Sequence, residues 1–314
     1  MDIVETKGLY KTYSKAKIKD YAVYDVSLNI KRSEILGLVG ESGCGKSTLG
    51  RLLLRLEKPT MGTITFEGKD ITNYSFGRMR RIRHAMQIVF QGSSNSFNPY
   101  YTVRQIIAEP LNNFCKIDEA EKERRITAML EQVDLGSEYL GRYSNELSGG
   151  QRQRVGIARA LIIKPEFVVC DEAVSSVDYI VKKQILKMLA GLKGQYGFTC
   201  LFISHDMEAI EAICDRIAVM YLGNIVEIMP HADSEALHPY TRALLAATLA
   251  PDPTVKRGKK LLFREGGDIE IPERGCIFQG RCLFSSEKCL SERPGLAEVG
   301  NGHFVACHRV RRNG

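Results

Sequence analysis

The sequence predicts an α/β fold with an open sheet whose functional site lies at the carboxyl ends of the strands. Apolar runs with the length of buried strands recur along the chain, separated by helical patterns: 34–39, 86–90, 167–171 and 199–203. Each of these runs leads directly into glycine or polar residues. Strands that alternate with helices and are followed by residues able to bind or react are typical of an open α/β sheet.

The N-terminal region predicts a separate antiparallel β layer. Residues 1–39 alternate short apolar patches with turns, and 63–66 followed by a turn adds another strand. Tyr13 lies in this layer, where its ring could stack on an adenine. From this region alone, a core or surface tyrosine is the better-supported interpretation.

The stretch 40–48 follows the strand 34–39 and fits the P-loop pattern G-x-x-x-x-G-K-[ST]. Its glycines let the backbone turn tightly and approach a phosphate, while Lys46 brings a positive charge and Ser47 a hydroxyl for Mg²⁺. A predicted helix over 47–56 points its positive end at the phosphates. The alternative is a chance glycine-rich turn. The predicted nucleotide contacts are Gly40, Glu41, Ser42, Gly43, Cys44, Gly45, Lys46, Ser47 and Thr48.

A polar, loop-like stretch over 92–99 precedes a charged region with helical spacing over 102–135, which predicts a mostly helical insert. After it, Leu147 leads into a second candidate anion site. Ser148 is a good N-cap residue, and the two glycines that follow leave backbone N–H groups bare at a helix start. The residues of this site are Ser148, Gly149, Gly150 and Gln151.

Two adjacent acids, Asp171 and Glu172, end the apolar strand 167–171. Carboxylates at the edge of a buried strand are costly unless they meet cations, and a Mg²⁺ ion with a lytic water would supply that reason. The strand 199–203 likewise ends in polar residues, among them His205.

Composition limits the class of protein. The 314 residues carry 44 basic and 37 acidic side chains, a net charge of +7, and are 44% apolar. This mild excess suits nucleotide binding or an anionic membrane surface, but it is not the dense patch of a nucleic-acid binder. The N-terminus lacks a signal-peptide layout and no apolar run reaches about 18 residues. We therefore expect a soluble, cytoplasmic protein that meets a membrane only through a partner.

Four of the nine cysteines lie in the last forty residues: Cys276, Cys282, Cys289 and Cys307. In a cytosolic chain such a cluster favours a metal over disulfides. The spacing contains no C-x-x-C and is not that of a ferredoxin, so it does not choose the metal, and His303 or His308 could replace a thiol. Free, inert thiols are the alternative.

In their order along residues 1–230, these motifs resemble those of the nucleotide-binding subunit of ABC transporters. The resemblance identifies 40–47 as Walker A, Gln91 as the Q-loop glutamine and 147–151 as the signature. It also identifies Walker B at 167–171 with Glu172, a D-loop ending at Asp178, a switch residue at His205 and an adenine-stacking aromatic at Tyr13. One departure is Ala173, where the family has proline.

The resemblance implies an ATPase that uses ATP and Mg²⁺. Lys46 would hold the phosphates, Glu172 would polarise the attacking water, and His205 would contact the γ-phosphate. Gln91 would sense that phosphate. The implied Mg²⁺ ligands are Ser47, Gln91 and Asp171. ATP would lie between two subunits, so that the signature closes on the ATP of the partner.

A narrower resemblance points to the oligopeptide/dipeptide importer branch. It rests on 89–99, on the amphipathic helix after 238 and on the cysteine-rich tail. It implies a [4Fe-4S] cluster on Cys276, Cys282, Cys289 and Cys307, with zinc as the alternative. Because these cysteines lie outside every ATP motif, we expect the cluster to be structural and not to approach the phosphates.

The predicted organisation is an ATPase domain over 1–230, with a helical subdomain at about 92–160, and an extension over 231–314. The insert at about 92–140 would dock on membrane subunits. The implied partners are two permease subunits, a second ATP-binding subunit that is a copy or a paralogue, and indirectly an extracytoplasmic solute-binding protein. The implied location is the cytoplasmic face of the membrane.

Other functions stay open at this stage. Related importers of nickel, glutathione or sugars use similar ATPases. A soluble ABC ATPase acting on nucleic acid would carry a long coiled-coil insert or tandem nucleotide domains, and the sequence has neither. A purely regulatory binding protein is disfavoured by the intact Glu172 and His205.

Overall fold

The computed structural model of the protein describes residues 1–13, 21–90, 97–175, 177–248 and 271–310. Gln91 and most of the polar stretch that follows it lie outside these ranges. The predictions made for Gln91 therefore stay predictions.

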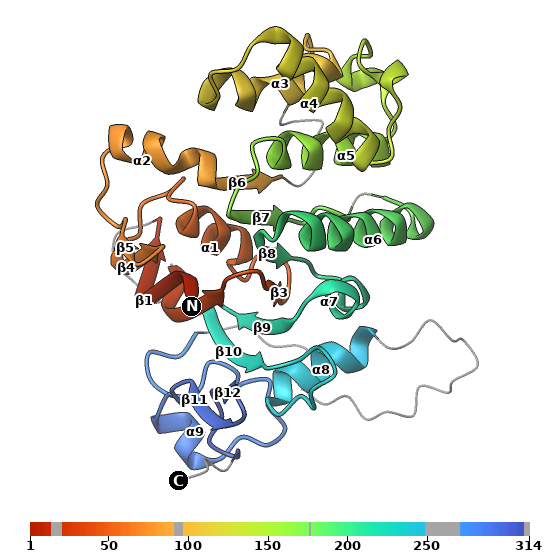
Figure 1. Cartoon of the computed structure of the whole chain (residues 1–314). Coiled ribbons are helices and arrows are strands. Elements are labelled where there is room, and N and C mark those ends of the chain that lie inside the picture. Colours follow the sequence, from red (N-terminus) through yellow and green to blue (C-terminus); the bar gives the residue numbers. More distant parts are fainter. Residues whose placement is uncertain (14–20, 91–96, 176, 249–270, 311–314) are drawn as a thin grey trace, which may run out of the picture.

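An eight-stranded sheet runs through the molecule (Figure 1), in the order β11-β12-β10-β9-β3-β8-β7-β6. The strands from β9 to β6 in this order are parallel, which confirms the predicted α/β fold. They are β3 (Ile35–Val39), β6 (Met86–Val89), β7 (Phe167–Asp171), β8 (Thr199–Ile203) and β9 (Arg216–Tyr221).

A second, four-stranded sheet in the order β2-β1-β4-β5 is antiparallel, as predicted. It consists of β1 (Asp2–Thr12), β2 (Tyr21–Lys31), β4 (Met61–Phe66) and β5 (Lys69–Asp70). The prediction of antiparallel structure for 1–39 is wrong at its end. All five residues of β3 are buried, and β3 pairs in parallel with β8 and β9 because it lies in the middle of the larger sheet.

Alternation along the strands separates two cores. In β3, Leu36 and Leu38 pack with α1 (Lys46–Leu53) and the antiparallel sheet. Ile35 and Val39 face the opposite side and pack with the core that α5, α6 and α7 help to form. Successive side chains of a strand point to opposite faces, so one buried strand serves both cores.

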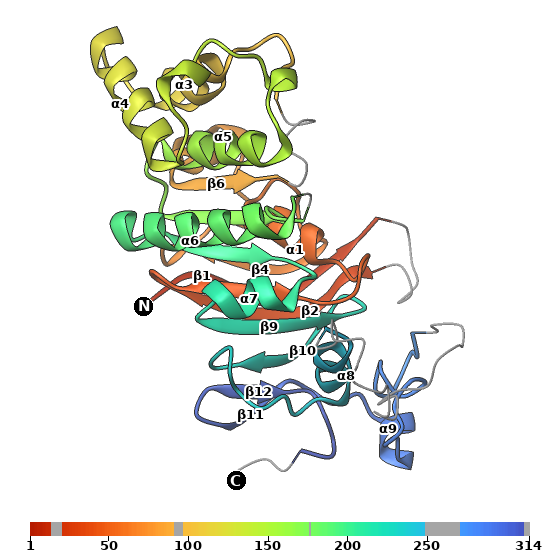
Figure 2. The same cartoon turned by 90° about the vertical axis from the view of Figure 1, so that its right-hand side faces the viewer.

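Helices complete the layers. In both views, α3, α4 and α5 stand beyond β6, which confirms the predicted helical insert (Figures 1 and 2). The helices are α2 (Phe76–Ile82), α3 (Val103–Phe114), α4 (Glu119–Gln132), α5 (Gly149–Leu161), α6 (Tyr179–Tyr196) and α7 (Met207–Ile213). Short 3₁₀ turns lie at η2 (Arg83–Ala85), η4 (Ser137–Tyr139) and η5 (Ser144–Glu146).

The C-terminal part joins the large sheet at the end away from the helical insert (Figure 1). β10 (Asn224–Met229) forms a hairpin with β9, and β12 (His303–Val305) pairs antiparallel with β10. The remaining elements are α8 (Pro239–Thr248), α9 (Glu287–Ser291) and β11 (Ala297–Gly300). Backbone hydrogen bonds therefore tie the extension to the rest of the chain.

Candidate functional site

The loop between β3 and α1 requires glycine at two positions. A Cβ atom at Gly40 would lie 2.1 Å from the carbonyl oxygen of Met220, and one at Gly45 would lie 2.0 Å from that of Ala22. Their φ angles are +154° and +108°, which residues other than glycine rarely adopt. The loop is thus pressed against its neighbours, with its amides at the start of α1.

Lys46, the first residue of α1, folds back over this loop. Its Nζ donates hydrogen bonds of 2.8 Å to the carbonyl oxygens of Gly40 and Glu41. The side chain is 5% exposed, so its charge is held inside the loop and not in bulk water. A phosphate in the loop would gain a preoriented cation together with the amides at a helix N-terminus.

Ser47 and Asp171 are 124 residues apart in sequence but meet at the end of β7. The Ser47 hydroxyl donates a 2.9 Å hydrogen bond to Oδ1 of Asp171. Burial raises the pKa of Asp171, opposed by this hydrogen bond and by Arg51 and Lys46. A divalent cation would offset the cost of burying the ionised carboxylate. A carboxylate with a hydroxyl is a donor set of the kind that Mg²⁺ prefers.

Glu172 and His205 come together beside this pair. Their side chains approach to 3.3 Å between Oε1 and Nδ1. Glu172 has a φ of +50°, and its backbone N–H donates to the carbonyl oxygen of Ile203. This unusual conformation turns the chain sharply after β7 and places the carboxylate outside the sheet.

A cavity of about 510 Å³ unites these groups. It is lined by Ala22, Ser42, Gly43, Gly45, Lys46, Ser47, Thr48, Glu172 and His205. The sequence pointed to all of these except Ala22, which belongs to β2 and gave no signal because only its position in the fold brings it here. The cavity thus combines backbone amides, a lysine, a carboxylate and an imidazole.

The remaining predicted residues occupy different places. The Tyr13 ring is 63% exposed, and its hydroxyl donates to Glu57 at 2.6 Å and lies 3.5 Å from the Thr48 hydroxyl, so it borders the loop. Ser148 caps α5 in a reciprocal capping box with Gln151. Asp178 caps α6 through two backbone N–H groups.

The signature residues do not contribute to this cavity. Within the described ranges, no residue of 148–151 lines it. Ser148 and Gly149 are instead exposed at the start of α5. The second anion site predicted from the two glycines is therefore open to solvent, available to a group from outside the subunit.

The extension reaches the nucleotide loop, a contact that no motif predicted. Nη1 of Arg281 donates to both carboxylate oxygens of Glu41 at 3.0 and 3.1 Å, and the Tyr240 hydroxyl accepts from the Glu41 backbone N–H at 3.0 Å. Neither residue is one of the four cysteines, so the expectation that a cluster on them does not approach the phosphates stays a prediction. Nothing in the sequence relates Glu41 to an arginine 240 positions later.

The four C-terminal cysteines are close enough for the charge of one thiolate to affect the pKa of another. Burial, together with the charges of Cys289, Cys307 and Cys282, raises the pKa of the Cys276 thiol to about 11. The Phe284 N–H donates to the Cys282 sulfur at 3.4 Å. As the side chains stand, the described part of the chain contains no group of three or more His, Cys, Asp or Glu residues arranged to hold a metal ion.

Comparison with known proteins adds to this geometry. Residues 23–175 match the family model described as "ABC transporter", and 226–289 match "Oligopeptide/dipeptide transporter, C-terminal region". The chain is 42% identical over 292 residues to the oligopeptide transport ATP-binding protein AppF of Bacillus subtilis, covering 91% of this chain and 89% of AppF. The chain belongs to the oligopeptide/dipeptide branch of the ABC transporter family.

Other relatives of this ABC subunit agree. The "Probable peptide ABC transporter ATP-binding protein y4tS" of Sinorhizobium fredii is 45% identical over 289 residues, covering 91% of this chain and 82% of the relative. Among solved structures, the ATP-binding cassette MJ0796, a dimer bound to ADP and Pi, matches at 28% identity with a TM-score of 0.67. That match covers 74% of this chain and 100% of the other.

Proposed function

We propose that this ABC subunit binds and hydrolyses ATP to power a membrane importer of di- and oligopeptides. The observation that carries the proposal is one cavity lined by the Lys46 loop, by Ser47 and by the Glu172–His205 pair, with Asp171 hydrogen-bonded to Ser47. The chain belongs to the oligopeptide/dipeptide branch over nearly its whole length, and this membership is the reason for proposing di- and oligopeptides as the cargo.

The chain's own groups divide the work of phosphoryl transfer. Mg²⁺, held by Ser47 and Asp171 with Gln91, would neutralise charge on the phosphates. Lys46 and the loop amides bind and orient the phosphates. Glu172 holds the attacking water and takes its proton, and His205, 3.3 Å from Glu172, contacts the γ-phosphate and keeps that carboxylate in place.

The site is completed by a second ATP-binding subunit, either a copy or a paralogue. Support comes from the exposed signature, because Ser148 and Gly149 are exposed at the start of α5, where the N–H groups of the first helical turn have no intrahelical acceptor. ATP would then lie between the cavity of one subunit and residues 148–151 of the other. The solved dimer of MJ0796 belongs to the same fold.

Two permease subunits and an extracytoplasmic solute-binding protein complete the proposed importer. Over the described residues, no helix has the length and apolar character needed to cross a bilayer. The subunit would bind peripherally at the cytoplasmic face, through the helical insert at about 92–140. Closure around ATP and reopening after hydrolysis would move the permeases.

Uptake by the assembled importer tests the function. We expect proteoliposomes that contain this subunit and its neighbouring permeases to accumulate labelled dipeptides only with ATP inside and solute-binding protein outside. Nickel and glutathione are tested in parallel. Accumulation of either in place of peptides would replace the cargo, and capture of RNA without permeases would replace the importer with a nucleic-acid machine.

We further propose that Cys276, Cys282, Cys289 and Cys307 bind a [4Fe-4S] cluster. When bound, the cluster would cross-link the extension through thiolate–iron bonds. Two features fit a cationic centre. Burial and neighbouring thiolates raise the pKa of the Cys276 and Cys282 thiols, which a metal would reverse, and the Phe284 N–H donates to the Cys282 sulfur.

Iron content checks the cluster. Anaerobically purified protein should be brown and contain iron and acid-labile sulfide in equal amounts, and Cys282→Ser should bleach it. Cys115→Ser, which changes a half-buried thiol at the end of α3, should leave the colour intact. Stoichiometric zinc without iron would overturn the choice of metal, and protein with no metal would leave four free thiols.

A further inference from the structure

Glu41 of the nucleotide loop is held from two directions by the C-terminal part of the chain. Arg281 donates to both of its carboxylate oxygens, at 3.0 and 3.1 Å. The Tyr240 hydroxyl accepts from its backbone N–H at 3.0 Å. An ion pair in which one guanidinium nitrogen meets both carboxylate oxygens, together with a backbone hydrogen bond, fixes both ends of this residue.

The same residue leads directly to the phosphate-binding lysine. The carbonyl oxygens of Gly40 and Glu41 are the acceptors for Nζ of Lys46, each at 2.8 Å. A displacement of Glu41 would therefore displace an acceptor that orients Lys46. Arg281 and Tyr240 contact Glu41, and Glu41 contacts the ammonium group of Lys46, so one residue separates the extension from the charge that would meet ATP.

Arg281 is itself confined by an aromatic cluster. Its guanidinium lies 5.9 Å from the ring centre of Tyr221 and 6.0 Å from that of Phe278, two side chains that are almost fully buried. Tyr240 closes the cluster, with ring centres 4.5 Å from Tyr221 and 5.6 Å from Phe278. Held between these rings and Glu41, Arg281 has little rotational freedom to lose when the loop closes on a ligand.

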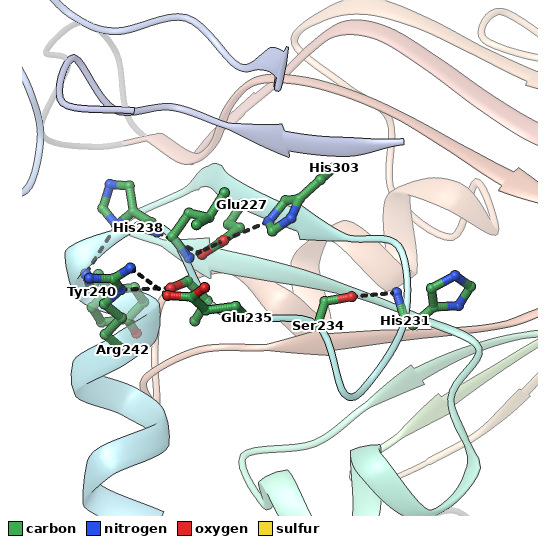
Figure 3. Close-up of polar contacts among 10 residues, drawn as sticks. Glu227, His231, Ser234, Glu235, His238, Tyr240, Arg242 and His303 are labelled. Atoms are coloured by element: carbon green, nitrogen blue, oxygen red, sulfur yellow. Dashed lines mark hydrogen bonds and ion pairs between the residues drawn. The ribbon is translucent and has the colours of Figure 1, made fainter. Parts of the chain in front are cut away.

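Tyr240 is anchored at the start of α8, as Figure 3 shows. His238 Nδ1 accepts from the Tyr240 backbone N–H at 3.1 Å, and burial lowers the pKa of His238 to about 4, which keeps the ring neutral and able to accept. The fully buried Glu227 accepts from the backbone N–H groups of Leu237 and His238, and His303 lies 2.8 Å from it. β10, β12 and α8 thus act as one support.

The turn that carries Arg281 is bounded by two of the cysteines. Within it the backbone N–H of Gln279 donates to the carbonyl of Cys276, and that of Cys282 donates to Phe278. Arg281 is the residue immediately before Cys282. The position of its guanidinium therefore depends on the conformation of the cysteine segment.

We propose that Arg281 and Tyr240 are positioning residues of the ATP site, through which the cysteine-bearing extension sets the affinity of the nucleotide loop. They act on Glu41, and through its carbonyl on Lys46. Neither residue lines the nucleotide cavity. Their effect falls on ATP binding and not on the hydrolytic step, because these contacts lead to Glu41 and Lys46, whereas Glu172 follows β7 and meets His205.

The test compares ATP binding at equilibrium with steady-state hydrolysis. Arg281→Ala should raise the Kd and KM for ATP about fivefold, the scale of a partly exposed, hydrogen-bonded ion pair, with kcat changed less than about twofold. Arg281→Lys should recover part of the affinity. Glu41→Ala should weaken binding similarly, and Arg281→Ala should add nothing in the Glu41→Ala background.

Lys288→Ala is the matched control. It removes an exposed ion pair with Glu292 in the same extension, so it should leave the Kd unchanged. Wild-type affinity in a folded Arg281→Ala variant would overturn the proposal. An equal loss in Lys288→Ala would also overturn it, because the effect would then be general loosening of the extension.

The link to the cysteines rests on the proposed cluster and is tested separately. Cys282→Ser should weaken ATP binding in the wild-type background and add no further loss in Arg281→Ala. Unchanged affinity in a bleached Cys282→Ser protein would refute transmission from the cysteine segment. Protein that lacks metal but still shows this coupling would refute only the cluster.

Discussion

Glu172→Gln should retain ATP binding and lose hydrolysis by a factor of at least about 100, the lower end of what a positioned general base contributes. The carboxylate follows Asp171 at the end of β7 and meets His205 at 3.3 Å. The amide keeps the size of the side chain but cannot accept the proton of the attacking water. Single-turnover hydrolysis and equilibrium ATP binding measure the two effects independently.

Glu235→Gln is the control for this substitution. Glu235 is a strongly exposed carboxylate that pairs with Arg242, and its change should leave turnover unaltered. Hydrolysis by Glu172→Gln at the wild-type rate would show that another group activates the water. Loss of ATP binding in the same variant would show that Glu172 instead maintains the shape of the loop.

Ser148→Arg should abolish hydrolysis at the site that it faces on the partner subunit and spare ATP binding in its own cavity. Ser148 is exposed at the start of α5 and lines no part of its own cavity. A bulky cation there would block closure of two subunits around one ATP. A mixed dimer that carries the substitution in one subunit, with nucleotide occupancy followed at each site, measures this.

Two further variants separate the causes. Ser148→Ala removes only the cap of α5, worth about 1 kcal/mol, so it should be much milder than Ser148→Arg. Ser137→Arg places the same charge on an exposed position of the helical insert and should have little effect. Equal loss at both sites of the mixed dimer would contradict the assignment of one signature to one partner site.

Local motifs made the nucleotide loop predictable. The strand 34–39, the glycines and Lys46 are contiguous in sequence, and their conformation follows from short-range sterics and burial. The acids after 167–171 were equally visible, because a buried strand that ends in charge needs a cation. Asp171 meets Ser47 because the loop before Ser47 follows β3 and Asp171 ends β7, and the carboxyl ends of parallel strands lie at one edge of the sheet.

Contacts set by the long-range course of the chain were not predictable. The pairing of Arg281 with Glu41 depends on β12 docking against β10 and on the helix that carries Tyr240. No periodicity or motif expresses such a pairing. The partners of β3 were not predictable for a related reason, since a short apolar run does not reveal which strands it pairs with.

The two outer strands of the large sheet, β6 and β11, are each four residues long. An outer strand presents unpaired backbone groups to other chains, and its tendency to template intermolecular pairing grows with its length. Such short borders give a second molecule little backbone to pair with. The two ATP-binding subunits of the proposed importer would therefore meet through the loops and helix ends around the nucleotide, where contact would depend on ATP and be reversible.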